Sequence, residues 1–108
     1  MIRIIEIRQP GGPEVLTLAT RERPVAERSE LLVKVAAAGI NRPDCLQRQG
    51  AYPPPPGASD IPGLEIAGEV EAVGADVQGF KPGDQVCALV PGGGYAEYCT
   101  VDETNALP

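Results

Sequence analysis

Two polar residues of this chain, Asn41 and Tyr52, lie at positions where they could hydrogen-bond a ligand. Asn41 directly precedes a segment with helical features, so its amide could satisfy free backbone N–H groups at the helix start or hydrogen-bond a polar ligand. Tyr52 precedes four consecutive prolines. Its hydroxyl could donate to a carbonyl oxygen, or its ring could serve only for packing. Residue type and position alone favour the structural role for both side chains.

Three further side chains with charged or nucleophilic groups lie beside apolar segments, Asp44, Cys45 and Glu65. Acidic side chains are mostly solvated in folded proteins, so we expect Asp44 and Glu65 at the surface. A free thiol most often behaves as a small apolar side chain, so we expect Cys45 to be buried.

Three consecutive glycines at positions 92–94 resemble a phosphate-binding loop in composition. Such a loop has to lead into the N-terminus of a helix, where free backbone N–H groups meet the phosphate. Here the glycines lead into residues 95–98, whose alternating pattern is typical of a strand. The sequence therefore predicts a structural hairpin turn at this position.

Residue counts exclude several kinds of site. The chain has no histidine and no CxxC pair, which excludes zinc fingers, histidine-based metal sites, catalytic triads and Cys–His dyads. Three widely separated cysteines favour a reducing, cytoplasmic setting over a disulfide framework. The net charge of −6 disfavours nucleic acid as a partner. No apolar run approaches the ~20 residues of a membrane-spanning helix.

Apolar residues alternate with polar ones in several short stretches, which predicts a mainly β fold. The expected strands cover residues 2–7, 15–18, 31–38, 65–73, 85–90 and 95–101. One helix is expected over residues 42–49, because Pro43 suits a first helical turn and Gly50 suits a C-terminal cap. Gly68 predicts a bulge or a close backbone contact within its strand. Together these elements predict a β-barrel or sandwich with one short helix.

Five stretches carry recognisable motifs in a fixed order. The motifs are G-[IV]-N-x-x-D, R-x-G-x-Y-x-x-P-P, P-G-x-E-x-A-G, [KR]-x-G-D-x-V and G-[GA]-[FY]-A-E-Y, found within residues 39–44, 46–56, 62–68, 81–86 and 93–98. Together they resemble the zeta-crystallin-type quinone oxidoreductases of the medium-chain dehydrogenase/reductase superfamily. The stretch around Tyr52 is most similar to the p53-inducible members. The resemblance covers nearly the whole chain.

The resemblance implies that residues 1–108 form a GroES-like, partly open β-barrel, the N-terminal and substrate-side domain of a longer two-domain enzyme. A separate Rossmann domain, absent from this chain, would bind most of the NADPH. The implied activity is hydride transfer to a quinone, and the chain alone is expected to be inactive. Two alternatives stay open: an enoyl or other activated-alkene reductase, and a non-enzymatic GroES-like interaction module. A homodimer is compatible with the resemblance.

The resemblance also implies roles for the two polar residues and reverses the preference for structural roles. Asn41 would contact the nicotinamide side of the cofactor or the substrate. Tyr52 would line the quinone pocket and hydrogen-bond a quinone oxygen as negative charge develops on it. Both are therefore expected to be catalytic residues, and Asn41 also a cofactor-binding one.

The resemblance further implies that the enzyme works without zinc. Zinc alcohol dehydrogenases carry a cysteine ligand where this chain has Asn41 and a histidine ligand where it has Leu64. A catalytic zinc needs three protein ligands. Their structural zinc lobe, with four cysteines, also has no counterpart after Cys99.

Overall fold

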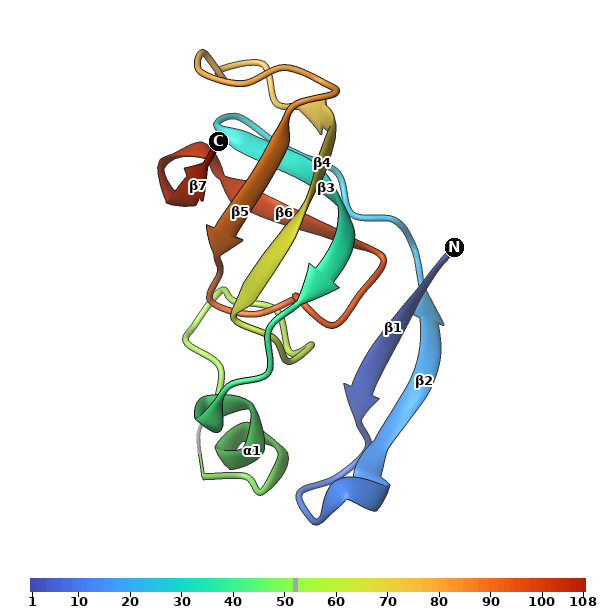
Figure 1. The fold of residues 1–108 in the computed structure, drawn as a ribbon. Helices are drawn as coiled ribbons and strands as arrows, with labels where there is room; N and C mark the ends of the chain where they lie inside the picture. Colours follow the sequence, from blue (N-terminus) through green and yellow to red (C-terminus); the bar gives the residue numbers. More distant parts are fainter. Residues whose placement is uncertain (52) are drawn as a thin grey trace.

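A curled five-stranded sheet dominates the structure, a computed structural model that describes residues 1–51 and 53–108. The strands follow the order β6-β3-β4-β5-β7, and all neighbours are antiparallel. Their bounds are β3 Glu30–Ala38, β4 Glu65–Val73, β5 Gln85–Leu89, β6 Tyr98–Asp102 and β7 Ala106–Leu107. Figure 1 shows that the sheet bends into an open half-barrel. This confirms the predicted mainly β, partly open barrel.

A two-stranded hairpin and a short helix lie beside the sheet (Figure 1). The hairpin joins β1 (Ile2–Ile7) to β2 (Leu16–Arg21), and the helix α1 spans Arg42–Arg48. The backbone N–H of Gly11, in the hairpin turn, donates to the carbonyl oxygen of Arg48 at 2.9 Å. The hairpin turn and the end of the helix are therefore bonded to each other.

Alternating side chains of the sheet build the main core. In β3, Leu31 and Val33 are fully buried, and Ile66 and Val70 of β4 meet them from the neighbouring strand. Since successive side chains of a strand point to opposite faces, each strand supplies every second residue to this core. Burying one such side chain stabilises the fold by about 1.5–3 kcal/mol.

Strands β3 and β4 approach each other very closely at Gly68. A Cβ added to Gly68 would overlap the carbonyl oxygen of Lys34 on β3. The register between the two strands also shifts nearby, between Val35 and Ala37. The close backbone contact expected at this glycine is therefore confirmed.

Two sequence predictions are corrected by the strand order. The glycines at 92–94 do not form a hairpin, because β3 and β4 lie between β5 and β6 in the sheet. The N–H groups of Gly93 and Gly94 instead donate to the carbonyl oxygens of Ile61 and Gly63, at 2.7 and 3.1 Å. Residues 95–97 also lie outside β6, because the segment turns to meet β1, where Ile5 N–H donates to Tyr95 O at 2.9 Å.

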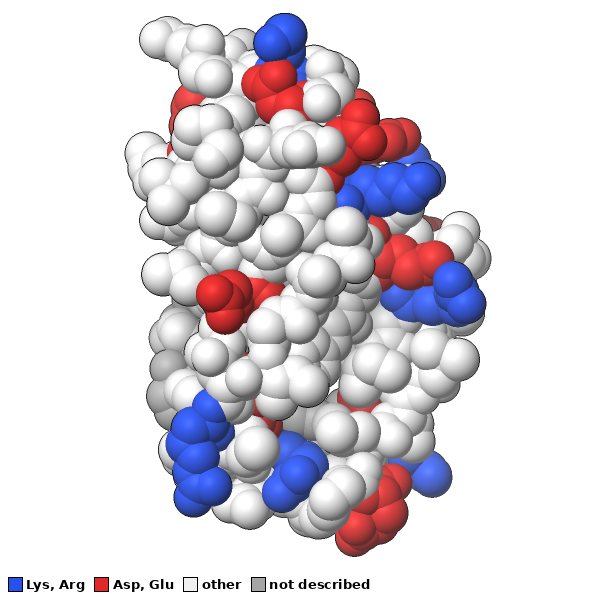
Figure 2. All heavy atoms as spheres, viewed as in Figure 1, with Lys and Arg blue, Asp and Glu red and all other residues white. Residues whose placement is uncertain are grey.

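Acidic and basic side chains lie next to each other along the right side of the molecule in Figure 2. Arg21 of β2, for example, is 2.7 Å from an Asp60 carboxylate oxygen and 3.6 Å from a Glu6 oxygen. The Arg21 hydrogen bond lowers the pKa of the Asp60 carboxyl. This contact ties the hairpin to the loop that precedes β4.

Within the described residues, no helix is both long and apolar enough to cross a membrane.

Candidate functional site

The start of α1 is fixed by hydrogen bonds within the helix start and by a backbone bond from the end of β3 to β4. Gly39 N–H, at the end of β3, donates to the carbonyl oxygen of Glu65 at 2.9 Å. Asn41 is the N-cap residue of α1. Its N–H donates to Asp44 Oδ2 at 3.0 Å, and Asp44 N–H donates back to Asn41 O at 3.0 Å. The residue predicted to meet a ligand is thus held between β3, β4 and the helix.

The side chain of Asn41 pairs with Glu65, the first residue of β4. Asn41 Nδ2 donates to Glu65 Oε1 over 3.3 Å, and the Asn41 side chain also faces the backbone of Asp44 in a capping-box arrangement. Glu65 is exposed, as predicted. The structure therefore shows a side-chain contact between Glu65 and Asn41 that the sequence did not predict.

Asp44 is buried, with 6% of its surface exposed, so its predicted surface position is wrong. The reason lies in its partners: Tyr95 Oη donates to Asp44 Oδ2 at 2.7 Å, beside the donation from Asn41 N–H. Within the part of the chain that the structure describes, the other oxygen, Oδ1, is buried without a hydrogen-bond partner. Buried carboxylates usually persist only where specific donors compensate for lost water. Asp44 therefore fixes the helix start from inside the protein.

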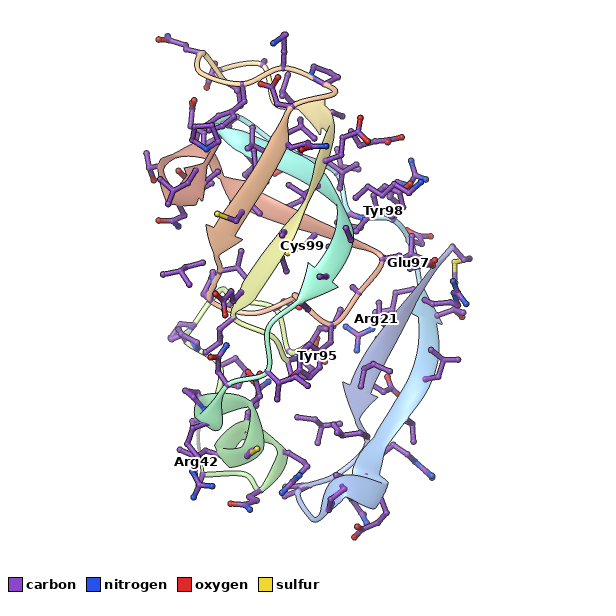
Figure 3. The ribbon with its side chains drawn as sticks, in the orientation of Figure 1. Arg21, Arg42, Tyr95, Glu97, Tyr98 and Cys99 are labelled. Carbon is purple, nitrogen blue, oxygen red and sulfur yellow. The ribbon has the colours of Figure 1, made fainter. Side chains whose placement is uncertain are left out.

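Tyr95 joins the glycine-rich segment to the helix. Figure 3 shows it where the chain approaching β6 passes between the sheet and α1. Burial, followed by the hydrogen bond to Asp44, raises the pKa of the Tyr95 hydroxyl. The hydroxyl therefore stays protonated at neutral pH and acts as a donor. The three-residue spacing of Asn41 and Asp44 at a helix start is the sequence signal that could have revealed this network.

A pocket of about 400 Å³ lies beside this network, between α1 and the β1–β2 hairpin. Its wall is mostly apolar and includes Ile5, Leu16, Ile40, Cys45, Pro62 and Tyr95. Ile40, next to Asn41, is 82% exposed. Cys45 is half-buried, where full burial was expected. The site thus combines a fixed amide with an adjoining apolar surface.

Tyr52, the other predicted catalytic residue, lies outside the described residues, so its role remains a prediction. The residues around it are described. Ala51 N–H donates to Leu46 O at 2.8 Å, which bonds this part of the chain to α1, and both Ala51 and Pro53 are exposed.

We expect the protein to contain no stoichiometric zinc. Among residues 1–51 and 53–108, no three His, Cys, Asp or Glu side chains cluster as a metal site would require. The reason for the expectation is the chemistry of Asn41 and the half-buried Leu64, since an amide and an aliphatic side chain are poor zinc ligands. Elemental analysis of a protein prepared without chelators tests this. One tightly held zinc per chain would contradict it.

A family model and several known proteins match most of this chain. A family model described as "Alcohol dehydrogenase GroES-like domain" matches residues 27–108. A protein of Lama guanicoe named "Quinone oxidoreductase" is 43% identical over 100 residues, which cover 91% of this chain and 30% of that relative.

Two solved structures show the same fold. The human synaptic vesicle membrane protein VAT-1 homolog-like protein has a TM-score of 0.91 at 33% identity, over 98% of this chain and 34% of that one. A mycobacterial protein solved in complex with NADPH has a TM-score of 0.85 at 34% identity, over 100% of this chain and 33% of that one. The chain therefore spans about a third of the length of the relatives it matches.

Proposed function

Because this chain belongs to the alcohol dehydrogenase GroES-like domain family, we propose that it is the substrate-side domain of a two-domain, zinc-independent oxidoreductase that reduces quinones with NADPH. The similarity to a quinone oxidoreductase and to a protein that binds NADPH supports this proposal. The observation that carries it is the placement of Asn41, a half-buried amide fixed by Glu65 beside the exposed Ile40.

The described residues fit one end of the cofactor. Asn41 offers hydrogen bonds to a polar group on a ring, and Ile40 offers an apolar surface against which a flat ring could lie. Within the described part of the chain, the glycines at 92–94 lead into no helix, so we assign the phosphate cradle to the rest of the polypeptide. When bound, NADPH would supply the hydride.

This chain's own contribution would be to position the reactants and exclude water. The amide of Asn41 would orient the reacting ring, because the amide itself is positioned by its neighbours in β4 and α1. Tyr52 would donate to a quinone oxygen as negative charge develops on it. The apolar Ile40 would keep water away from the transferred hydride.

The acidic composition and the unpaired cysteines support two further parts of the proposal: the protein does not bind nucleic acid, and it is cytoplasmic. The net charge of −6 disfavours binding to nucleic acid. Cys45, Cys87 and Cys99 are all free thiols in the structure, which supports a cytoplasmic protein. A homodimer is our proposal for the assembly, and sedimentation velocity tests it.

Oxidation of NADPH by the intact polypeptide tests the proposed reaction. We expect a quinone-dependent loss of the NADPH absorbance, with a higher kcat/KM for para-quinones than for enones of similar size. The chain of 108 residues alone should give no rate, because hydride transfer needs both reactants held together. A preference for enones would indicate an activated-alkene reductase. The absence of turnover with both would favour the interaction module.

A further inference from the structure

The carboxylate of Glu65 lies directly over Gly39. A Cβ added to Gly39 would overlap Glu65 Oε1, so the missing side chain of this glycine leaves room for the carboxylate. The backbone bond from Gly39 N–H to Glu65 O holds the two residues together. In this position Glu65 reaches Asn41, two residues further along the chain.

The contact with Glu65 sets the orientation of the Asn41 amide. An ionised carboxylate can only accept hydrogen bonds, so the NH₂ group of Asn41 must face Glu65. On its other side, the Asn41 side chain faces the helix start in the capping-box arrangement. The Glu65 carboxylate therefore opposes rotation of the amide by half a turn, because that would place the Asn41 oxygen against a negative charge.

This orientation leaves a donor for a ligand. Glu65 takes one of the two Nδ2–H bonds, and within the described residues the second one has no recorded acceptor. Asn41 is half-buried, and its neighbour Ile40 is strongly exposed. A ligand that reaches the Asn41 amide could accept this second N–H bond, because Glu65 occupies only the first.

We infer that Glu65 is a positioning residue that makes Asn41 a hydrogen-bond donor to a carbonyl oxygen of the bound ligands. This inference rests on the proposed function. Two ligands there carry such an oxygen, the quinone and the carboxamide of the nicotinamide. A donor to the quinone oxygen would act mainly as charge develops during reduction, whereas a donor to the carboxamide would act on cofactor binding.

A swap of the two side chains separates positioning from folding. Asn41→Asp alone places two carboxylates against each other and should lower the melting temperature. Adding Glu65→Gln lets the glutamine amide donate to the new aspartate, so the pair and the melting temperature should recover. The direction of the bond is then reversed, and the aspartate introduced at position 41 has no side-chain N–H to offer a ligand.

The measurements are made on the intact polypeptide: melting temperature, the Kd for NADPH by fluorescence, and kcat/KM for a quinone. In the double variant we expect a near wild-type melting temperature. Either the affinity for NADPH or kcat/KM for the quinone should fall about ten-fold, the size expected for one hydrogen bond. A loss in kcat/KM alone identifies the quinone oxygen as the acceptor. A weaker Kd for NADPH identifies the carboxamide.

Glu69→Gln is the matched control, because Glu69 is also exposed and lies four residues along β4 on the same face. It should leave all three measurements unchanged. A double variant with recovered melting and unchanged Kd and kcat/KM would overturn the inference and leave the proposed function standing. A wild-type polypeptide that neither binds NADPH nor reduces quinones would overturn both.

Discussion

Replacing Asp44 by alanine is expected to lower the free energy of unfolding by about 2–3 kcal/mol. The substitution removes the acceptor for two donors at once, the hydroxyl of Tyr95 and the N–H of Asn41. Hydrogen bonds to a charged group contribute more than neutral ones, and the helix also loses part of its cap. Urea denaturation of the intact polypeptide followed by circular dichroism measures the change. A loss below about 0.5 kcal/mol would show that the network contributes little to stability.

A double-mutant cycle with Tyr95→Phe isolates the contact between the two side chains. Because they are hydrogen-bonded at 2.7 Å, the losses in Asp44→Ala and Tyr95→Phe should not add. We expect a coupling energy of about 1–2 kcal/mol. Asp76→Ala is the control, since Asp76 is exposed and such surface changes usually stay within about 0.5 kcal/mol.

The pH dependence of this cycle has a definite sign. The pKa of Tyr95 is raised in the folded protein by burial and by the bond to Asp44. The folded state therefore holds this proton more tightly than the unfolded state does. The resulting stabilisation is complete below the ordinary tyrosine pKa of about 10 and is lost as the pH rises through the raised value. The difference in stability between wild type and Tyr95→Phe should accordingly shrink above about pH 10.

Replacing Tyr52 by phenylalanine is expected to lower kcat/KM for quinones by roughly ten- to a hundred-fold in the intact polypeptide. In the proposed function its hydroxyl donates to the quinone oxygen mainly as negative charge develops there. The Kd for NADPH should change much less, because the proposed two-domain enzyme would hold most of the cofactor outside these residues. Steady-state kinetics and a thermal melt of the same preparation measure both effects.

Tyr98→Phe is a suitable comparison for the Tyr52 variant. Tyr98 lies at the start of β6, and the guanidinium of Arg23 stacks over its ring with the guanidinium carbon 4.0 Å from the ring centre. That contact needs the ring and not the hydroxyl, so Tyr98→Phe should leave kcat/KM unchanged. If Tyr52→Phe were equally silent, Tyr52 would be a packing residue, and Asn41 would remain as the polar side chain proposed to contact a ligand.

Local patterns predicted most of the elements. The alternation in β1, β3 and β4 and the Pro43 and Gly50 signals around α1 placed these elements to within one or two residues. These signals succeed because they reflect backbone preferences and burial within single segments. The strand β2 was predicted too short, because its last residues are held by pairing with β1, as in the pair Ile2 and Arg21.

Contacts between distant segments could not be predicted in the same way. The burial of Asp44 depends on Tyr95, which lies 51 positions further along the chain, and single-segment patterns treat any carboxylate as solvated. The hairpin expected at the glycines failed for a related reason. Their neighbours in the fold are Ile61 and Gly63, and no local signal specifies that approach. Asn41 and Glu65 were both named from the sequence, Asn41 as a candidate ligand contact and Glu65 as a surface acid. The hydrogen bond between their side chains follows only from the geometry.

The strand order has a consequence for how the protein reaches its native state. β3 lies between β4 and β6, and Leu31 pairs with Val101 near the other end of the chain. Sheets built from such distant pairs fold slowly, typically in milliseconds to seconds. During synthesis the β1–β2 hairpin can form early, but one edge of β3 stays open until β6 has left the ribosome. Nascent chains that pause before that point would expose Leu31 and Val33 along an unpaired strand edge, and such exposed apolar surface favours aggregation.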